Sequence, residues 1–171
     1  SSRLDGIRIL SGVEVDIRSN GSLDLDDESL AARDWVVASI HSGFRDPPKE
    51  IGRRILSAID NPHVDCIGHP TGRKIGRRSP YDVDLEQIFA RAVETGTALE
   101  INGQPDRLDL RDTHARLAAE SGVRIVVSSD AHSVGGLGYV DLAVSQARRA
   151  WLTAAQVVNT RPWAELTRMR A

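Results

Sequence analysis

Along this 171-residue chain, an apolar segment of strand length is followed five times by a helical pattern. This alternation is typical of parallel β-strands joined by crossover helices. The strands are expected at residues 7–17, 35–42, 64–69, 97–102 and 125–129. The main helices are expected at residues 24–33, 47–60, 84–95, 110–121 and 142–151, with two short helices after them. The sequence therefore predicts an α/β fold with a parallel sheet.

We expect the chain to form one globular domain over residues 1–171. With 40% hydrophobic residues, it has enough apolar side chains for a sizeable core. The sequence contains no apolar run of 18 residues and no signal peptide, so we expect a cytoplasmic protein without a membrane partner. The single cysteine, Cys66, lies in an apolar segment and is expected to be a buried, inert thiol.

Acidic residues and histidines stand at the ends of the expected strands. The first strand carries Glu14, the second ends at His41 and the third at His69, while Asp130 and His132 follow the fifth. Because parallel strands place their carboxyl ends at one edge of a sheet, these side chains should converge. Carboxylates and imidazoles together suit Zn²⁺, Mn²⁺ or Fe²⁺. We therefore predict that these five residues are catalytic and bind metal.

A basic loop follows His69 and contains four cations in six residues, Arg73, Lys74, Arg77 and Arg78. Guanidinium groups and glycine amides in such a loop are suited to a phosphate. We predict that Arg73, Arg77 and Arg78 bind substrate; the alternative is a solvated basic loop. The net charge of −2 excludes a surface that is basic throughout, so phosphate binding must be local.

Two further residues, Arg107 and Asn102, belong to the predicted substrate-binding rim at the same edge of the sheet. Phe44 and Tyr81 also lie in loops that follow the strands. Their rings either stack on a nucleotide base or pack beneath the loops, and the sequence leaves both alternatives open.

Five motifs together resemble the polymerase and histidinol phosphatase (PHP) family. They begin at Gly12-Val-Glu14, Ala38-Ser-Ile-His41, Ile67-Gly-His69, Leu99-Glu-Ile-Asn102 and Ser129-Asp130-Ala-His132. Within that family, the chain resembles the C-terminal domain of bacterial family X DNA polymerases. The resemblance implies a distorted seven-stranded β/α barrel that holds up to three metal ions, with Mn²⁺ or Zn²⁺ as the candidates. It also implies that Glu14 bridges two ions, that His41 and His69 complete one of those sites, and that Asp130 and His132 each serve another.

The family's first strand supplies a His-x-His pair and its second an Asp-His pair, and neither is present in this sequence. A β/α unit takes roughly 30 residues, so five units account for the chain. We therefore expect a partial barrel that lacks about two units on its N-terminal side. The resemblance to the family X polymerases also implies that the parent chain carries a polymerase domain before this one.

The resemblance implies a metal-dependent phosphoesterase, most concretely a 3′-5′ exonuclease that acts on DNA 3′ ends. Metal ions would supply the nucleophile from water, so no serine or cysteine is required. Two alternatives stay open. One is a small-molecule phosphatase of the histidinol-phosphate type, and the other is a non-catalytic scaffold domain.

Overall fold

The fold is organised around a five-stranded parallel sheet in a computed structural model that describes residues 7–169. The strands are β1 (Gly12–Asp16), β2 (Trp35–Ser39), β3 (Cys66–Ile67), β4 (Ala98–Asn102) and β5 (Ile125–Ser128). Each strand pairs in parallel with the next one in the chain, so the spatial order is β1-β2-β3-β4-β5. The predicted α/β fold is confirmed, and the sheet is compatible with part of a β/α barrel.

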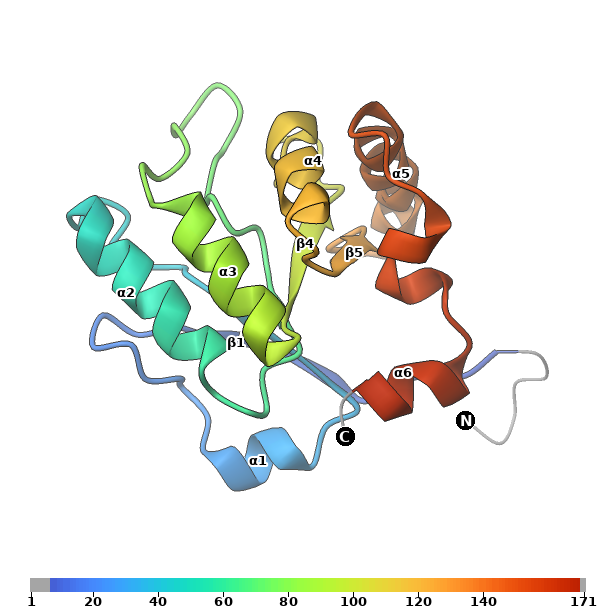
Figure 1. Ribbon diagram of the computed structural model, residues 1–171, viewed down its shortest axis with the longest axis horizontal. Coiled ribbons are helices and arrows are strands. Elements are labelled where there is room, and N and C mark those ends of the chain that lie inside the picture. Colours follow the sequence, from blue (N-terminus) through green and yellow to red (C-terminus); the bar gives the residue numbers. More distant parts are fainter. Residues whose placement is uncertain (1–6, 170–171) are drawn as a thin grey trace.

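Helices connect the strands and cover one face of the sheet (Figure 1). Figure 1 shows α2, α3, α4 and α5 in a row, whereas α6 lies apart, close to the N-terminal segment. None of the helices within residues 7–169 is long and apolar enough to cross a membrane. The α-helices are α1 (Asp27–Ala31), α2 (Pro48–Ile59), α3 (Leu85–Thr95), α4 (Asp112–Glu120), α5 (Val140–Arg149) and α6 (Trp163–Met169). The 3₁₀ helices are η1 (Val134–Tyr139), η2 (Ala154–Gln156) and η3 (Val158–Thr160).

Local signals account for several helix boundaries. Asp26 caps α1 by accepting a hydrogen bond from the Ser29 amide at 2.7 Å, and Asp84 caps α3 in the same manner. Gly96 ends α3 at a positive φ of 76°, a conformation that glycine adopts without steric cost. The isoleucines of α2 are spaced by four residues and are all buried: Ile51, Ile55 and Ile59.

All five predicted strands are shorter in the structure than expected, β1 and β3 by the most residues. The ladder of β1 starts at Gly12 because its partner β2 starts opposite it at Trp35, which leaves residues 7–11 without a strand partner. Strand β3 keeps only Cys66 and Ile67 of the predicted 64–69 segment. The first helix is likewise shorter than the predicted 24–33, and the predicted 142–151 helix begins two residues earlier, as α5, directly after η1.

The core lies mainly between the sheet and helices α2 to α5. Alternate residues of the strands point toward these helices, including Val36, Ala38 and Ile101. On the opposite face, Cys66 packs with Val158 of η3 and Leu166 of α6. The predicted burial of the Cys66 thiol is confirmed, and burial raises its pKa well above the usual value.

Candidate metal centre

Glu14, His41 and His69 come together at the carboxyl edge of the sheet, and we call these three residues the metal cluster. Glu14 lies on β1, and the two histidines follow the adjacent strands β2 and β3. Glu14 Oε1 is 3.5 Å from His41 Nε2 and 3.2 Å from His69 Nε2. The two imidazole rings meet edge to face with centroids 5.1 Å apart. The sheet thus brings together three of the five predicted ligands.

The geometry of the metal cluster fits a divalent ion. One ligand atom from each residue lies within 4.8 Å of the other two. Ligands of a tetrahedral ion at about 2.0–2.1 Å lie about 3.3 Å apart, close to the two distances from Glu14. One carboxylate with two imidazoles suits Zn²⁺ and Mn²⁺ alike, so the donor set does not select one of them.

Asp16 orients His41, although the sequence analysis does not name it as a site residue. Its carboxylate oxygen Oδ1 makes a short hydrogen bond with His41 Nδ1. A proton held on Nδ1 by this carboxylate leaves Nε2 with its lone pair directed at the metal cluster. The signal was present in the sequence, because Asp16 is two residues from Glu14 and shares its side of the strand.

The charge of Glu14 is stabilised by its histidine neighbours. Burial by itself raises the pKa of Glu14, but the hydrogen bond and the charge of His69, together with the charge of His41, outweigh it. The resulting pKa is about 2, against an ordinary value of 4.5. Glu14 is therefore an anion over the whole physiological range, which is the form that binds a cation.

A second set of polar residues, the Glu100 network, lies where β4 and β5 end and consists of Glu100, Asn102, Ser128 and Asp130. Glu100 Oε2 accepts hydrogen bonds from the His69 amide at 2.6 Å and from Asn102 Nδ2 at 3.2 Å, and Oε1 accepts one from the Ser128 hydroxyl. Glu100 is buried, and burial raises its pKa. Glu100 lies in the Leu99-Glu-Ile-Asn102 motif but was not predicted as a site residue.

The two remaining predicted ligands, Asp130 and His132, are not part of the metal cluster. Asp130 Oδ2 accepts a hydrogen bond from Asn102 Nδ2 at 3.0 Å and lies 3.8 Å from Arg107 Nε. The side chain of His132 is 81% exposed, and its Nδ1 lies 2.9 Å from the Asp130 carbonyl oxygen. Asn102 is fully buried, and its side-chain amide is hydrogen-bonded within the protein. It is therefore not exposed on the rim that was predicted to bind substrate.

Backbone strain is concentrated at this edge of the sheet. His69, Leu108 and Asp130 have positive φ angles of 29°, 44° and 49°, which side-chain-bearing residues rarely adopt. The surrounding structure holds these segments in place, because the buried Asp109 accepts hydrogen bonds from the Thr71 amide at 3.0 Å and from the Thr71 hydroxyl at 2.7 Å. Strained residues of this kind are common at binding and catalytic sites.

The arginines of the basic loop differ in what they contact. Arg73 donates hydrogen bonds to the carbonyls of Arg107 and Leu108 and so ties the loop to the segment after β4. Arg78 Nε donates to the Gly72 carbonyl at 2.7 Å. Arg77 is exposed, and its side chain makes no hydrogen bond within residues 7–169. Arg77 and the unused edge of the Arg78 guanidinium are thus free to meet an anion.

Phe44 and Tyr81 pack beneath the basic loop. The two rings stack at 6.5 Å with an interplanar angle of 16°, and the Arg78 guanidinium lies 3.6 Å from the centre of the Phe44 ring. Burial raises the pKa of Tyr81 to about 12. The sequence left open whether these rings stack on a nucleotide base or pack beneath the loops, and the structure shows the second arrangement.

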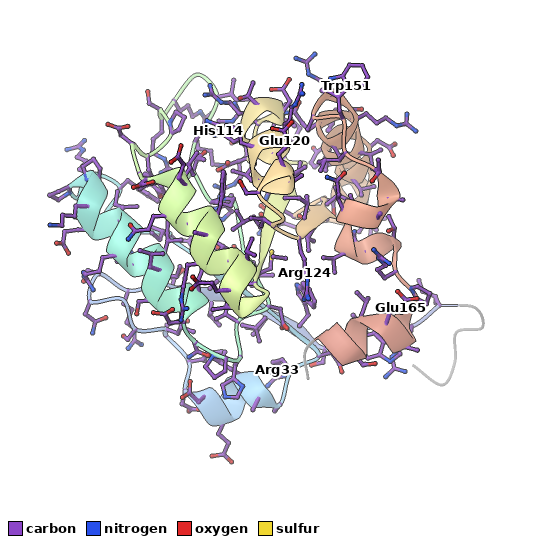
Figure 2. The ribbon with its side chains drawn as sticks, viewed as in Figure 1. Arg33, His114, Glu120, Arg124, Trp151 and Glu165 are labelled. Carbon is purple, nitrogen blue, oxygen red and sulfur yellow. The ribbon has the colours of Figure 1, made fainter. Side chains whose placement is uncertain are left out.

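The opposite edge of the sheet has a different character. Arg124, just before β5, donates a hydrogen bond to the Gly96 carbonyl at 3.3 Å and shares a small hollow with Leu166 of α6. Figure 2 shows Arg124 on the α6 side of the molecule. Within the described residues, the only group of acids and histidines with metal-ligand spacing is thus at the carboxyl edge.

The chain is similar in sequence to several known proteins. The chain is 46% identical over 161 residues to the DNA polymerase/3′-5′ exonuclease PolX of Bacillus subtilis, covering 94% of the chain and 28% of that protein. It is 36% identical over 168 residues to a probable phosphatase of Thermoanaerobacter sp. and 30% identical over 172 residues to one of Shewanella sp.. The chain spans 66% of the length of each of these phosphatases. No family model matches the chain. The similarity to PolX shows that the chain resembles the C-terminal PHP domain of family X DNA polymerases.

Proposed function

We propose that this chain is a metal-dependent hydrolase of phosphoesters. The observation that carries the proposal is the convergence of Glu14, His41 and His69, whose ligand atoms lie within 4.8 Å of one another. The relatives support it, since they are named as an exonuclease and as probable phosphatases. Divalent ions in such sites activate water and stabilise charge that develops on phosphoryl oxygens.

The side chains have distinct roles in this proposal. Glu14, His41 and His69 hold one Mn²⁺ or Zn²⁺ ion, and Asp16 keeps His41 in the tautomer that binds it. Asp130 and His132 serve further ions, up to three in all. Both residues lie at the same carboxyl edge as the metal cluster. Asp130 is linked to that cluster by hydrogen bonds of the Glu100 network, which run through Asn102 and Glu100 to the His69 amide.

The substrate proposed first is the 3′ end of DNA, with 3′-5′ exonuclease activity. The name of the Bacillus subtilis relative supports this choice. Arg77 and Arg78 are suited to the phosphates of an extended substrate, because Arg78 is held by Gly72 and Phe44 with one edge of its guanidinium unused. Arg107 lies next to Asp130 and neutralises charge closer to the reacting phosphate.

The second candidate is a phosphatase for small monoesters such as histidinol phosphate. The curated relatives named as probable phosphatases favour it, and the chain spans a larger share of their length than of PolX. The same metal cluster serves both candidates, so the difference lies in the surroundings of the site.

In the complete protein, we propose that the sheet is part of a seven-stranded β/α barrel and that a polymerase domain precedes it. The five-stranded parallel sheet is compatible with such a barrel. The match to only 28% of PolX is consistent with a longer parent chain. We further propose that this parent protein is cytoplasmic.

An assay of the complete encoded protein separates these candidates. We expect Mn²⁺-dependent release of nucleotides from a 3′-recessed DNA primer, abolished by chelator and by His69→Ala. Release of phosphate from histidinol phosphate without nucleotide release would select the second candidate. If neither activity appears and the melting temperature does not respond to Mn²⁺, Zn²⁺ or chelator, the domain is a scaffold.

A further inference from the structure

A fully buried arginine lies behind the metal cluster. Arg54, in the middle of α2, has an exposed fraction of 0% and is among the largest side chains buried in the core. Arginine is rarely buried without partners, because an uncompensated charge in the core is costly. Its contacts therefore indicate what it does there.

The Arg54 guanidinium joins the two chain segments that leave β1 and β2. Nε donates to the Arg18 carbonyl at 3.0 Å, and Nη2 donates to the Ile17 carbonyl. Nη1 donates to the Ser42 carbonyl at 3.0 Å and pairs with the Asp46 carboxylate at 3.2 Å. One planar group thus holds three main-chain carbonyls from two strand exits, which an aliphatic side chain does not do.

These carbonyls belong to residues that directly follow the site. Ile17 comes immediately after Asp16, and Ser42 comes immediately after His41. Asp16 and His41 are hydrogen-bonded to each other, and His41 in turn faces Glu14. The position of the guanidinium therefore sets how far apart the two strand exits lie and, with them, the carboxylates and the imidazole.

The turn after His41 is built around this guanidinium. Gly43 has a positive φ of 70°, and a Cβ atom at this position would overlap the Asp46 carboxylate and lie 2.8 Å from Arg54 Nη1. A side chain at residue 43 would displace the arginine or the turn. The close packing leaves the Ser42 carbonyl little freedom to move.

A hydrophobic side chain of similar volume would fill the same space but has no donor to offer. The carbonyls of Ile17, Arg18 and Ser42 would then lose this partner. What a hydrophobic residue would lose here is the connection between the two strand exits. We propose that Arg54 is a positioning residue that preorganises Glu14, Asp16 and His41 for the metal ion; this inference rests on the proposed function.

The test compares Arg54→Met with Arg53→Met in the complete encoded protein. Arg53 is the matched control, because it is the adjacent residue and also donates to two carbonyls, of Ser19 at 2.9 Å and Asn20 at 3.1 Å, but it is exposed. We expect Arg54→Met to weaken Mn²⁺ binding 10- to 100-fold in titration calorimetry, as loss of an outer-shell partner does. Arg53→Met should stay within about twofold of the wild type.

A second variant covers the case in which Arg54→Met does not fold. Arg54→Lys keeps the buried charge but lacks the planar fork, so it should fold and bind Mn²⁺ about tenfold more weakly. A folded Arg54 variant with wild-type Mn²⁺ affinity would overturn the inference, even if its melting temperature fell. A wild-type protein that binds neither Mn²⁺ nor Zn²⁺ would instead overturn the proposed function, and this inference with it; if only Zn²⁺ binds, the same comparison is made with Zn²⁺.

Discussion

The metal cluster and the Glu100 network lie at the same edge of one sheet but treat their carboxylates in opposite ways. In the metal cluster, the side chain of Glu14 is 36% exposed and that of His41 is 38% exposed, and their ligand atoms face one another. In the Glu100 network, Glu100 is only 7% exposed, and both of its oxygens accept hydrogen bonds from protein donors. The Glu14 carboxylate therefore still has oxygen lone pairs available for a cation, whereas the oxygens of Glu100 already accept hydrogen bonds from the protein.

Neighbouring but separate residues therefore stabilise the fold and bind the metal ion. A buried carboxylate with several donors holds chain segments together, and its removal leaves those donors unpaired. An accessible carboxylate beside two imidazoles contributes less to the fold and more to binding.

Replacing His69 by alanine should reduce Mn²⁺ affinity at least about 100-fold, because a three-residue site cannot lose a direct ligand without loss of the ion. The measurement is the metal content after dialysis of the complete protein. His63→Ala is the control, since His63 lies in the turn before β3 and is not part of the metal cluster. Unchanged metal content in His69→Ala would remove this residue from the site.

Replacing Glu100 by alanine should lower the free energy of unfolding by about 2–4 kcal/mol, because the His69 amide, Asn102 and Ser128 lose their acceptor. Urea denaturation in the presence of chelator measures this loss without a contribution from metal. Glu94→Ala is the control and should change stability by less than about 0.5 kcal/mol, because Glu94 is an exposed residue of α3. A loss below that limit in Glu100→Ala would show that the network is not structural.

Replacing Arg77 and Arg78 together by alanine should leave metal content unchanged but weaken DNA binding. Loss of two phosphate contacts is expected to reduce the slope of log K against log salt by about 1–2. Binding titrations over a range of salt concentrations test this expectation, with Arg116→Ala on α4 as the control. An unaltered slope in the double variant would leave the basic loop as a solvated surface.

The smallest expected effect is the pH dependence contributed by Glu14. Its folded-state pKa of about 2 lies below the ordinary 4.5, so its stabilising contribution is present above pH 4.5 and is lost as the pH falls toward 2. Because the side chain is partly exposed, we expect only about 1 kcal/mol. The stability difference between the metal-free wild type and Glu14→Gln should therefore shrink over this pH range. An NMR titration of the Glu14 carboxyl with a midpoint near 4.5 would contradict the expectation.

The sequence by itself determined the order of strands and helices and the edge at which the polar residues gather. The spacing of apolar residues and the helix-capping residues are local signals that can be read from the sequence. In a parallel sheet, the carboxyl ends of all strands lie at one edge. The expected convergence of Glu14, His41 and His69 followed from this rule, and their ligand atoms lie within 4.8 Å of one another. Their role as metal ligands stays a prediction. The roles of Asp130 and His132 as ligands stay predictions.

Only the tertiary structure decided which of these residues are close enough to share an ion. The sheet order alone does not separate them, because β1 and β5 each lie two strands from β3. The direction of the side chains does: Glu14 Oε1 lies 3.2 Å from His69 Nε2, whereas Asp130 accepts a hydrogen bond from Asn102 and His132 is exposed. The adjacent residues Arg53 and Arg54 are a second case that the sequence alone cannot decide. They are chemically identical in the sequence, yet one is exposed and the other fully buried, because successive residues of a helix face directions about 100° apart and only packing determines which direction is inward.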